Sequence, residues 1–265
     1  MRRNSQQRHG LVRTAWAAVA AAVLLSAPAL ADTITIRADA WCPYTCEPKS
    51  DKPGYLIEIA KRVFEAAGHK VDYRLLPWPR AVSEVRKGAY TAIAGGGAAD
   101  TPGFALTQPM GEAITELAFR KGEKVDYKGP DSLKGLRLGA PAGVVSWGAG
   151  IDEYVAAHKD DPKSVDMSGG EDAYEVNLKK LLAKRVDVIV DDGNVLGWLT
   201  RRLGVAAKIE TITVLTENDV YIAFSPANGK SAEYAALLDQ GVEKLRATGE
   251  LAKILARYGL SDWQH

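Results

Sequence analysis

An alternation of strand-like and helix-like patterns near the start of the chain constrains the fold most. Residues 34–39 alternate apolar and polar side chains, as a half-buried strand does, and residues 54–68 space apolar residues as a helix does. Residues 71–75 predict a second strand, residues 79–88 a second helix, and residues 92–94 a third strand. This order predicts a mostly parallel sheet with helices on both faces, and therefore an α/β fold.

The first predicted strand runs into the segment Trp-Cys-Pro-Tyr-Thr-Cys at residues 41–46. Pro43 offers no N–H and constrains its neighbour, so the strand ends there. Ligands of open α/β sheets bind beyond the carboxyl ends of strands, so we expect Trp41 and Tyr44 to form one wall of a ligand cleft. Trp78 follows the second strand and is similarly placed. The alternative for all three is a turn or core aromatic.

The N-terminal residues predict a leader that is removed. Four arginines precede an apolar run at residues 15–25, and Ala29-Leu30-Ala31 is a small-x-small cleavage site. The alternative is an uncleaved anchor. The full chain has 34 basic and 33 acidic residues. Cleavage after Ala31 removes four arginines and no acids, which leaves 30 basic and 33 acidic residues, a net charge of about −3 with neutral His. We therefore expect an exported, periplasmic protein that binds no nucleic acid.

Two cysteines in an exported chain predict a disulfide between Cys42 and Cys46, because that compartment is oxidising. The closed loop is very short, so we expect it to stiffen the Trp41 segment more than to stabilise the whole fold. Zinc is the alternative, but the histidines that remain after cleavage are scattered without ligand spacing. We expect neither a metal nor another cofactor.

Further along, the same kinds of pattern resume. Strands are predicted near residues 114–120, 136–139, 165–167, 186–190 and 220–224, and helices over residues 144–158, 171–185, 231–246 and 250–258. A polar stretch at residues 121–130 separates the opening unit from the second group of strands and helices. The chain therefore predicts two lobes.

Three segments carry a resemblance to a known family: residues 54–60 (GYLIEIA), 185–192 (RVDVIVDD) and 245–251 (LRATGEL). In this order they resemble bacterial extracellular solute-binding proteins of family 3, which deliver polar amino acids and related solutes to ABC importers. The resemblance implies a type II two-lobed fold that closes around a solute by hinge motion. It places lobe 1 at residues 32–121 and 218–265 and lobe 2 at residues 122–217, with crossings near 120–123 and 216–219.

Two charged residues are candidates for holding a ligand. Arg80 can grip a carboxylate in a cleft, or it is a solvated arginine in the first turn of a helix. Asp192 ends the strand of residues 186–190, and in amino-acid receptors of the resembled family the matching aspartate holds the ligand ammonium. The alternative is a solvated Asp191-Asp192 turn, or a carboxylate pair for acid–base work.

Backbone donors are expected at two glycine-rich segments. Gly95 and Gly96 end the third strand, where N–H groups can approach a ligand closely. Gly143 and Ser146 precede a predicted helix and form a candidate anion site, or else a simple N-terminal cap.

The sequence departs from the resembled family at one point. Amino-acid receptors carry an arginine shortly after the third strand, but no Lys or Arg occurs here between Lys87 and Arg120. Either Arg80 substitutes for it, or the ligand is not an ordinary α-amino acid. We expect a monomeric receptor without catalysis that binds a small polar solute and delivers it to an inner-membrane permease. The alternatives are a dehydratase that uses Asp100 or Glu112, and a sensory ligand-binding protein.

Overall fold

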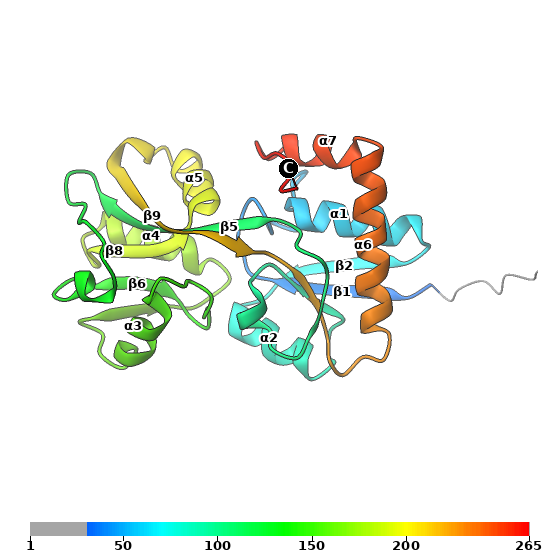
Figure 1. Ribbon diagram of the computed structural model, residues 1–265, viewed down its shortest axis with the longest axis horizontal. Helices are drawn as coiled ribbons and strands as arrows, with labels where there is room; N and C mark the ends of the chain where they lie inside the picture. The colour runs from blue at the N-terminus through cyan, green and yellow to red at the C-terminus, as the bar shows by residue number, and fades with distance from the viewer. Residues whose placement is uncertain (1–30, 265) are drawn as a thin grey trace, which may run out of the picture. The chain divides into compact units, whose positions relative to one another are not determined.

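The protein is described by a computed structural model, which covers residues 31–264 apart from the side chains of Thr216 and Glu217. The predicted leader lies outside the described residues, except for Ala31. Within the described range the strands form two five-stranded sheets covered by helices (Figure 1). The predicted α/β fold class is confirmed.

The first sheet has the strand order β2-β1-β3-β10-β4. Strands β2, β1 and β3 are parallel, as the opening pattern predicts, while β10 runs antiparallel to both β3 and β4. Its strands are β1 (Thr33–Ala38), β2 (Lys70–Leu75), β3 (Ala92–Ala94), β4 (Ala105–Leu106) and β10 (Ile222–Phe224). A C-terminal strand therefore completes an N-terminal sheet.

The second sheet has the order β7-β6-β8-β5-β9, in which β7, β6 and β8 are parallel and β5 and β9 antiparallel. Its strands are β5 (Glu112–Arg120), β6 (Leu138–Pro141), β7 (Val165–Ser168), β8 (Val188–Asp192) and β9 (Ile209–Asp219). In each sheet one antiparallel strand, β10 or β5, thus lies between the parallel group and the edge strand, β4 or β9.

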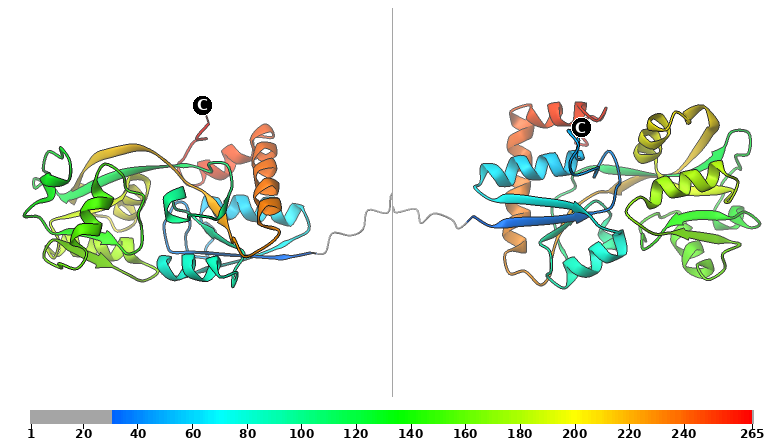
Figure 2. Two further views of the ribbon diagram at one scale, coloured as in Figure 1. Left: turned by 60° about the horizontal axis from the view of Figure 1, so that its bottom comes forward. Right: turned by 180° about the vertical axis from the view of Figure 1, so that it is seen from behind.

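Helices cover the sheets as their apolar faces require. They are α1 (Tyr55–Ala66), α2 (Trp78–Arg86), α3 (Ile151–His158), α4 (Ala173–Leu182), α5 (Gly193–Arg202), α6 (Ser231–Ala247) and α7 (Glu250–Ala256). Helices α1, α6 and α7 contact one another on one side of the first sheet and α2 lies on the other side, as the view from behind also shows (Figure 2).

The predicted helix at residues 144–158 is wrong in its first half, because α3 begins only at Ile151. The Asp152 carboxylate accepts the N–H groups of Trp147 and Gly148 at 3.1 and 2.7 Å, which holds the preceding chain as a loop. Gly148 and Gly150 also have positive φ values of 65° and 80°, outside the right-handed helical region. The segment before α3 is therefore a loop, in which Val145 and Ser146 contact Asp100 of the first sheet's region.

Strands β5 and β9 lie side by side and connect the regions of the two sheets (Figure 1). Next to these strands, just before β5 and just after β9, the Met110 N–H donates to the Val220 carbonyl and the Val220 N–H to the Gly111 carbonyl. Because β5 already pairs with β8 in the second sheet, the chain enters that sheet upstream of the boundary predicted at residue 121. The division into lobes itself remains a prediction.

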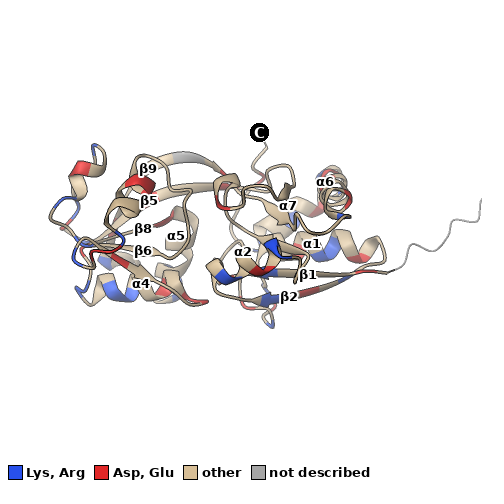
Figure 3. Cartoon of the chain, turned by 90° about the horizontal axis from the view of Figure 1, so that it is seen from below, with Lys and Arg blue, Asp and Glu red and all other residues tan. Residues whose placement is uncertain are grey.

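Basic and acidic residues are interspersed along the helices and strands (Figure 3). Among residues 31–264, no helix combines the length and apolar character that a bilayer span needs.

Candidate functional site

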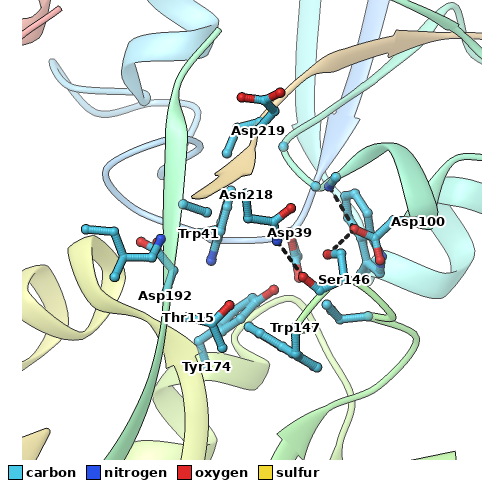
Figure 4. A pocket seen from close by; sticks show the side chains of 18 residues that line it. Asp39, Trp41, Asp100, Thr115, Ser146, Trp147, Tyr174, Asp192, Asn218 and Asp219 are labelled. Atoms are coloured by element: carbon cyan, nitrogen blue, oxygen red, sulfur yellow. Dashed lines mark hydrogen bonds between the residues drawn. The ribbon is translucent and has the colours of Figure 1, made fainter. Parts of the chain in front are cut away.

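A pocket lies between the two sheets, with a cavity volume of about 30 Å³ (Figure 4). It is lined by residues at the carboxyl ends of β1, β3 and β8, in the loop after β6, at the starts of α2 and α4, and on β5 and β9. The lining consists of Asp39, Trp41, Trp78, Gly95, Gly96, Gly97, Asp100, Ala113, Ile114, Thr115, Val144, Ser146, Trp147, Tyr174, Asp192, Asn218, Asp219 and Val220. The site is thus built by both sheets and by the strands that cross between them.

Trp41 is held by the short loop that follows β1. Its N–H donates to the Thr45 carbonyl at 2.7 Å, and Cys42 and Cys46 are joined by a disulfide, as predicted. The indole stacks on the Tyr44 ring at a centroid distance of 4.0 Å and an interplanar angle of 16°. The loop therefore presents Trp41 to the pocket and keeps Tyr44 behind it.

The glycines after β3 give space to two tryptophans. At Gly95 an added Cβ would lie 3.1 Å from the Trp41 ring, and at Gly96 only 2.6 Å from the Trp78 ring. Both have positive φ values, 86° and 90°, which favour glycine. The Gly95 N–H donates to the Tyr221 carbonyl, so its backbone donor is already used.

The Asp100 carboxylate accepts hydrogen bonds from the loops after β3 and β6, which belong to different sheets. It accepts the Gly97 N–H at 2.8 Å, the Val145 N–H at 2.8 Å and the Ser146 hydroxyl at 2.6 Å. Burial raises the pKa of Asp100, and these three hydrogen bonds oppose that rise. Of the predicted anion site at Gly143 and Ser146, only Ser146 binds this carboxylate, and it lies in a loop and not at a helix N-terminus.

Asp39, one residue beyond β1, is the least satisfied carboxylate in the pocket. It is only 3% exposed, and its Oδ2 has no hydrogen-bond partner within the described part of the chain. Burial, together with the nearby Asp100, raises the pKa of Asp39 to about 7. A buried oxygen without a donor points to a partner from outside the chain.

Asp192 ends β8 and caps α5. Its Oδ1 accepts the Val195 N–H at 3.0 Å and its Oδ2 the Ile114 N–H at 2.7 Å. Burial raises the pKa of Asp192 to about 7 despite these donors, and raises that of the neighbouring Asp191 well above its usual value. The pair is therefore buried and not the solvated turn that the sequence left open.

Among the other predicted site residues, Trp41, Trp78, Gly95, Gly96 and Ser146 join Asp192 in the lining. Tyr44 lies behind Trp41, where its hydroxyl donates to the Glu112 carbonyl and accepts the Asn194 amide. Gly143 lies outside the lining. Arg80 is also outside it, because it lies on α2 with an exposed side chain. The prediction that its guanidinium lies in the cleft is therefore wrong.

Sequence reasoning missed several contributors to the pocket, among them Asp39, Trp147 and Tyr174. Asp39 carried the same signal as Asp192, a carboxylate at the carboxyl end of a buried strand, and was not singled out. Trp147 falls within the helix predicted at residues 144–158, which begins only at Ile151, and Tyr174 at the start of α4 gives no signal. Within the described residues, no group of three or more His, Cys, Asp or Glu side chains is arranged to hold a metal ion.

Comparison with known proteins identifies relatives of this architecture. Residues 34–261 match the profile of "Bacterial extracellular solute-binding proteins, family 3". YxeM of Bacillus subtilis (strain 168), a probable amino-acid-binding protein, is 23% identical over 220 residues, 82% of this chain and 79% of YxeM.

Solved structures share the fold at low identity. A chain from a study of glutathione import via GshT and the cystine importer TcyBC of Streptococcus mutans has a TM-score of 0.73 at 17% identity, covering 88% of this chain and 97% of that one. An ancestral arginine-binding protein bound to arginine gives 0.69 at 19%, covering 86% and 98%. A histidine kinase sensor domain gives 0.67 at 20%, covering 87% and 98%.

Proposed function

Since the chain belongs to the bacterial extracellular solute-binding proteins of family 3, we propose that it is the exported solute receptor of an ABC-type importer. It binds a small polar, amino-acid-like solute in the pocket between the two sheets and delivers it unchanged to a permease in the inner membrane. The receptor acts as a monomer in the periplasm.

The observation that carries this proposal is that a single pocket is lined from both sheets and from both crossing strands. A cavity of about 30 Å³ is too small to hold a solute unless its walls move apart. The pairing of β5 with β9 is irregular between Ala113 and Glu116, beside the pocket. We place the hinge there, so that each sheet with its helices moves as one lobe.

Within the pocket the side chains have distinct roles. Trp41 and Trp78 supply apolar contact area, and Gly95 and Gly96 allow the two indoles to approach the solute. Asp192 attracts a positively charged group, as a buried carboxylate does. Arg80 takes no part.

Export is supported by the family's extracellular character and by the Cys42–Cys46 disulfide, which belongs to an oxidising compartment. A sensory role is the second candidate, because a histidine kinase sensor domain has the same fold. Uptake of the solute by cells with and without the gene separates the two, since a pure sensor leaves uptake unchanged.

A dehydratase is less well supported. Such an enzyme needs a carboxylate of raised pKa beside an arginine that anchors the substrate. Asp100 has the raised pKa, but none of the described residues that line the pocket is an arginine. Glu112, the other candidate acid, is exposed at the start of β5.

The test is thermal unfolding of the protein, expressed from the full chain, against a library of amino acids, amines, sugars and organic acids. A compound at about 100 times its Kd stabilises the folded state by roughly 2.7 kcal/mol, which moves the unfolding midpoint measurably. Mass spectrometry after incubation then shows whether the compound is unchanged, as a receptor requires, or converted, as an enzyme would do.

Two variants locate the binding. Trp41→Ala is expected to abolish the shift, because it removes a wall of the pocket, whereas Arg80→Ala leaves it intact. A shift that depends on Arg80 and not on Trp41 would contradict the proposed site.

A further inference from the structure

The charges in the pocket narrow the class of solute. Four described lining residues are carboxylates, namely Asp39, Asp100, Asp192 and Asp219, and among the described lining residues none is Lys, Arg or His. Any ligand that carries a carboxylate would enter a field of like charge with no basic side chain to meet it. The pocket is therefore unfavourable to anions.

The backbone and hydroxyl donors that would hold a carboxylate beside Ser146 already bind Asp100. The Gly97 N–H, the Val145 N–H and the Ser146 hydroxyl all donate to Asp100, and they come from both sides of the pocket. A ligand carboxylate would have to displace Asp100 and leave it buried without these hydrogen bonds, which costs free energy. The chain supplies its own carboxylate at the place where a ligand would offer one.

What remains available suits a cation. Asp39 presents Oδ2, which has no hydrogen-bond partner among the described residues, and the aromatic lining consists of Trp41, Trp78, Trp147 and Tyr174. In the view of Figure 4, Asp39 lies between Trp41 and the Asp100–Ser146 pair. Aromatic faces attract cations, and a buried oxygen acceptor calls for an N–H donor.

We propose that the solute is a small organic cation with an N–H group and no carboxylate, an amine or a guanidine. This proposal rests on the proposed receptor function and narrows its substrate class. The ammonium or guanidinium donates to Asp39, and the rest of the molecule lies between the indoles. The indole N–H groups of Trp41, Trp78 and Trp147, unpartnered within the described chain, suit a neutral oxygen on such a solute.

The test compares pairs of compounds that differ by one carboxylate: agmatine with arginine, cadaverine with lysine, and tyramine with tyrosine. Affinities are measured by calorimetry on the full-chain product. The amine is expected to bind at least tenfold tighter than its amino acid in every pair that binds. Asp39→Asn is expected to weaken amine binding at least tenfold, while Asp126→Asn, at a carboxylate that is 79% exposed, leaves it unchanged.

If Asp39→Asn folds poorly, a second variant still tests the preference for cations. Asp100→Ala frees the three donors, so the preference for the amine over its amino acid is expected to shrink at least tenfold. Tighter binding of the amino acids to the unaltered protein, or binding only of sugars or organic acids, would overturn the cation proposal and leave the receptor function intact. The absence of binding by any compound in the library would contradict both.

Discussion

The Ser146 hydroxyl donates a 2.6 Å hydrogen bond to the Asp100 carboxylate and so joins the loop after β6 to the loop after β3. These loops belong to different sheets, and both line the pocket. The same carboxylate accepts the Val145 N–H. One aspartate therefore connects the two halves of the site and accepts the hydrogen bonds that these donors could otherwise give to an anionic ligand.

Removing this connection is expected to favour an open form. Ser146→Ala deletes a hydrogen bond to a charged group, which is worth about 1.5–3 kcal/mol, so the open population rises roughly tenfold or more. Small-angle X-ray scattering without ligand measures this as a larger radius of gyration. The matched control is Ser164→Ala, whose hydroxyl also donates to an aspartate, Asp161, at an exposed site. An equal change in both variants would contradict the assigned link.

Gly96 is expected to be essential for the position of Trp78. In Gly96→Ala the new Cβ lies 2.6 Å from the indole at a φ of 90°, whereas in Gly103→Ala the φ is 83° and no described atom lies within 4 Å. Both variants pay about 1–2 kcal/mol for the left-handed backbone, but only Gly96→Ala displaces the tryptophan. Equilibrium unfolding and ligand affinity, measured together, check this: stability falls in both and affinity in one. Equal affinity in the two variants would refute the role of Gly96.

The disulfide is expected to matter more for binding than for stability. Its loop is short, so its removal costs about 2 kcal/mol or less, but Trp41 and Tyr44 lose their fixed stack. Reductant is therefore expected to lower ligand affinity more clearly than the urea midpoint. The Cys42→Ser/Cys46→Ser variant serves as the control that no longer responds to reductant. Unchanged affinity on reduction would show that the loop holds Trp41 without the bond.

Stability is expected to fall as the pH rises from about 4 to 7. Burial raises the pKa of Asp39 and of Asp192 from 3.8 to about 7, so across this range the folded protein binds more protons than the unfolded chain. The free energy of unfolding then declines by at most about 1.4 kcal/mol per pH unit for each group. The titratable groups whose charges interact with Asp39 include Asp100, Tyr73 and Tyr174. Those that interact with Asp192 include Asp191, Tyr44 and Tyr55.

Urea unfolding at about pH 5 and pH 7.5 measures this slope. Asp39→Asn is expected to flatten it and Asp126→Asn to leave it unchanged. A stability that rises over this interval in the unaltered protein, and does not respond to Asp39→Asn, would contradict the buried state of this carboxylate.

Local patterns predicted much of the fold and less of the site. The spacing of apolar residues predicted α1, and the pattern at residues 79–88 predicted α2 to within one residue of its start, because helix and strand periods are local properties. The start of α3 was predicted too early, since the interaction of Asp152 with the N–H groups of Trp147 and Gly148 competes with an apolar pattern that looks helical.

The pocket depends on contacts that no local pattern contains. Asp100 meets Val145 and Ser146 across 45 and 46 residues of sequence. Arg80 was expected in the cleft because of its charge, but the orientation of α2 leaves it in solvent. Position at the end of a strand was the useful signal, and it applied to Asp39 as much as to Asp192.

Hydrogen exchange tests the central claim, that one solute is held by both sheets at once, most directly. The protein is compared with and without the compound that raises its unfolding midpoint most. We predict slower exchange of backbone amides both at residues 95–100 and at residues 144–148. Protection of only one of these segments, or of neither, would contradict a ligand bound between the two sheets.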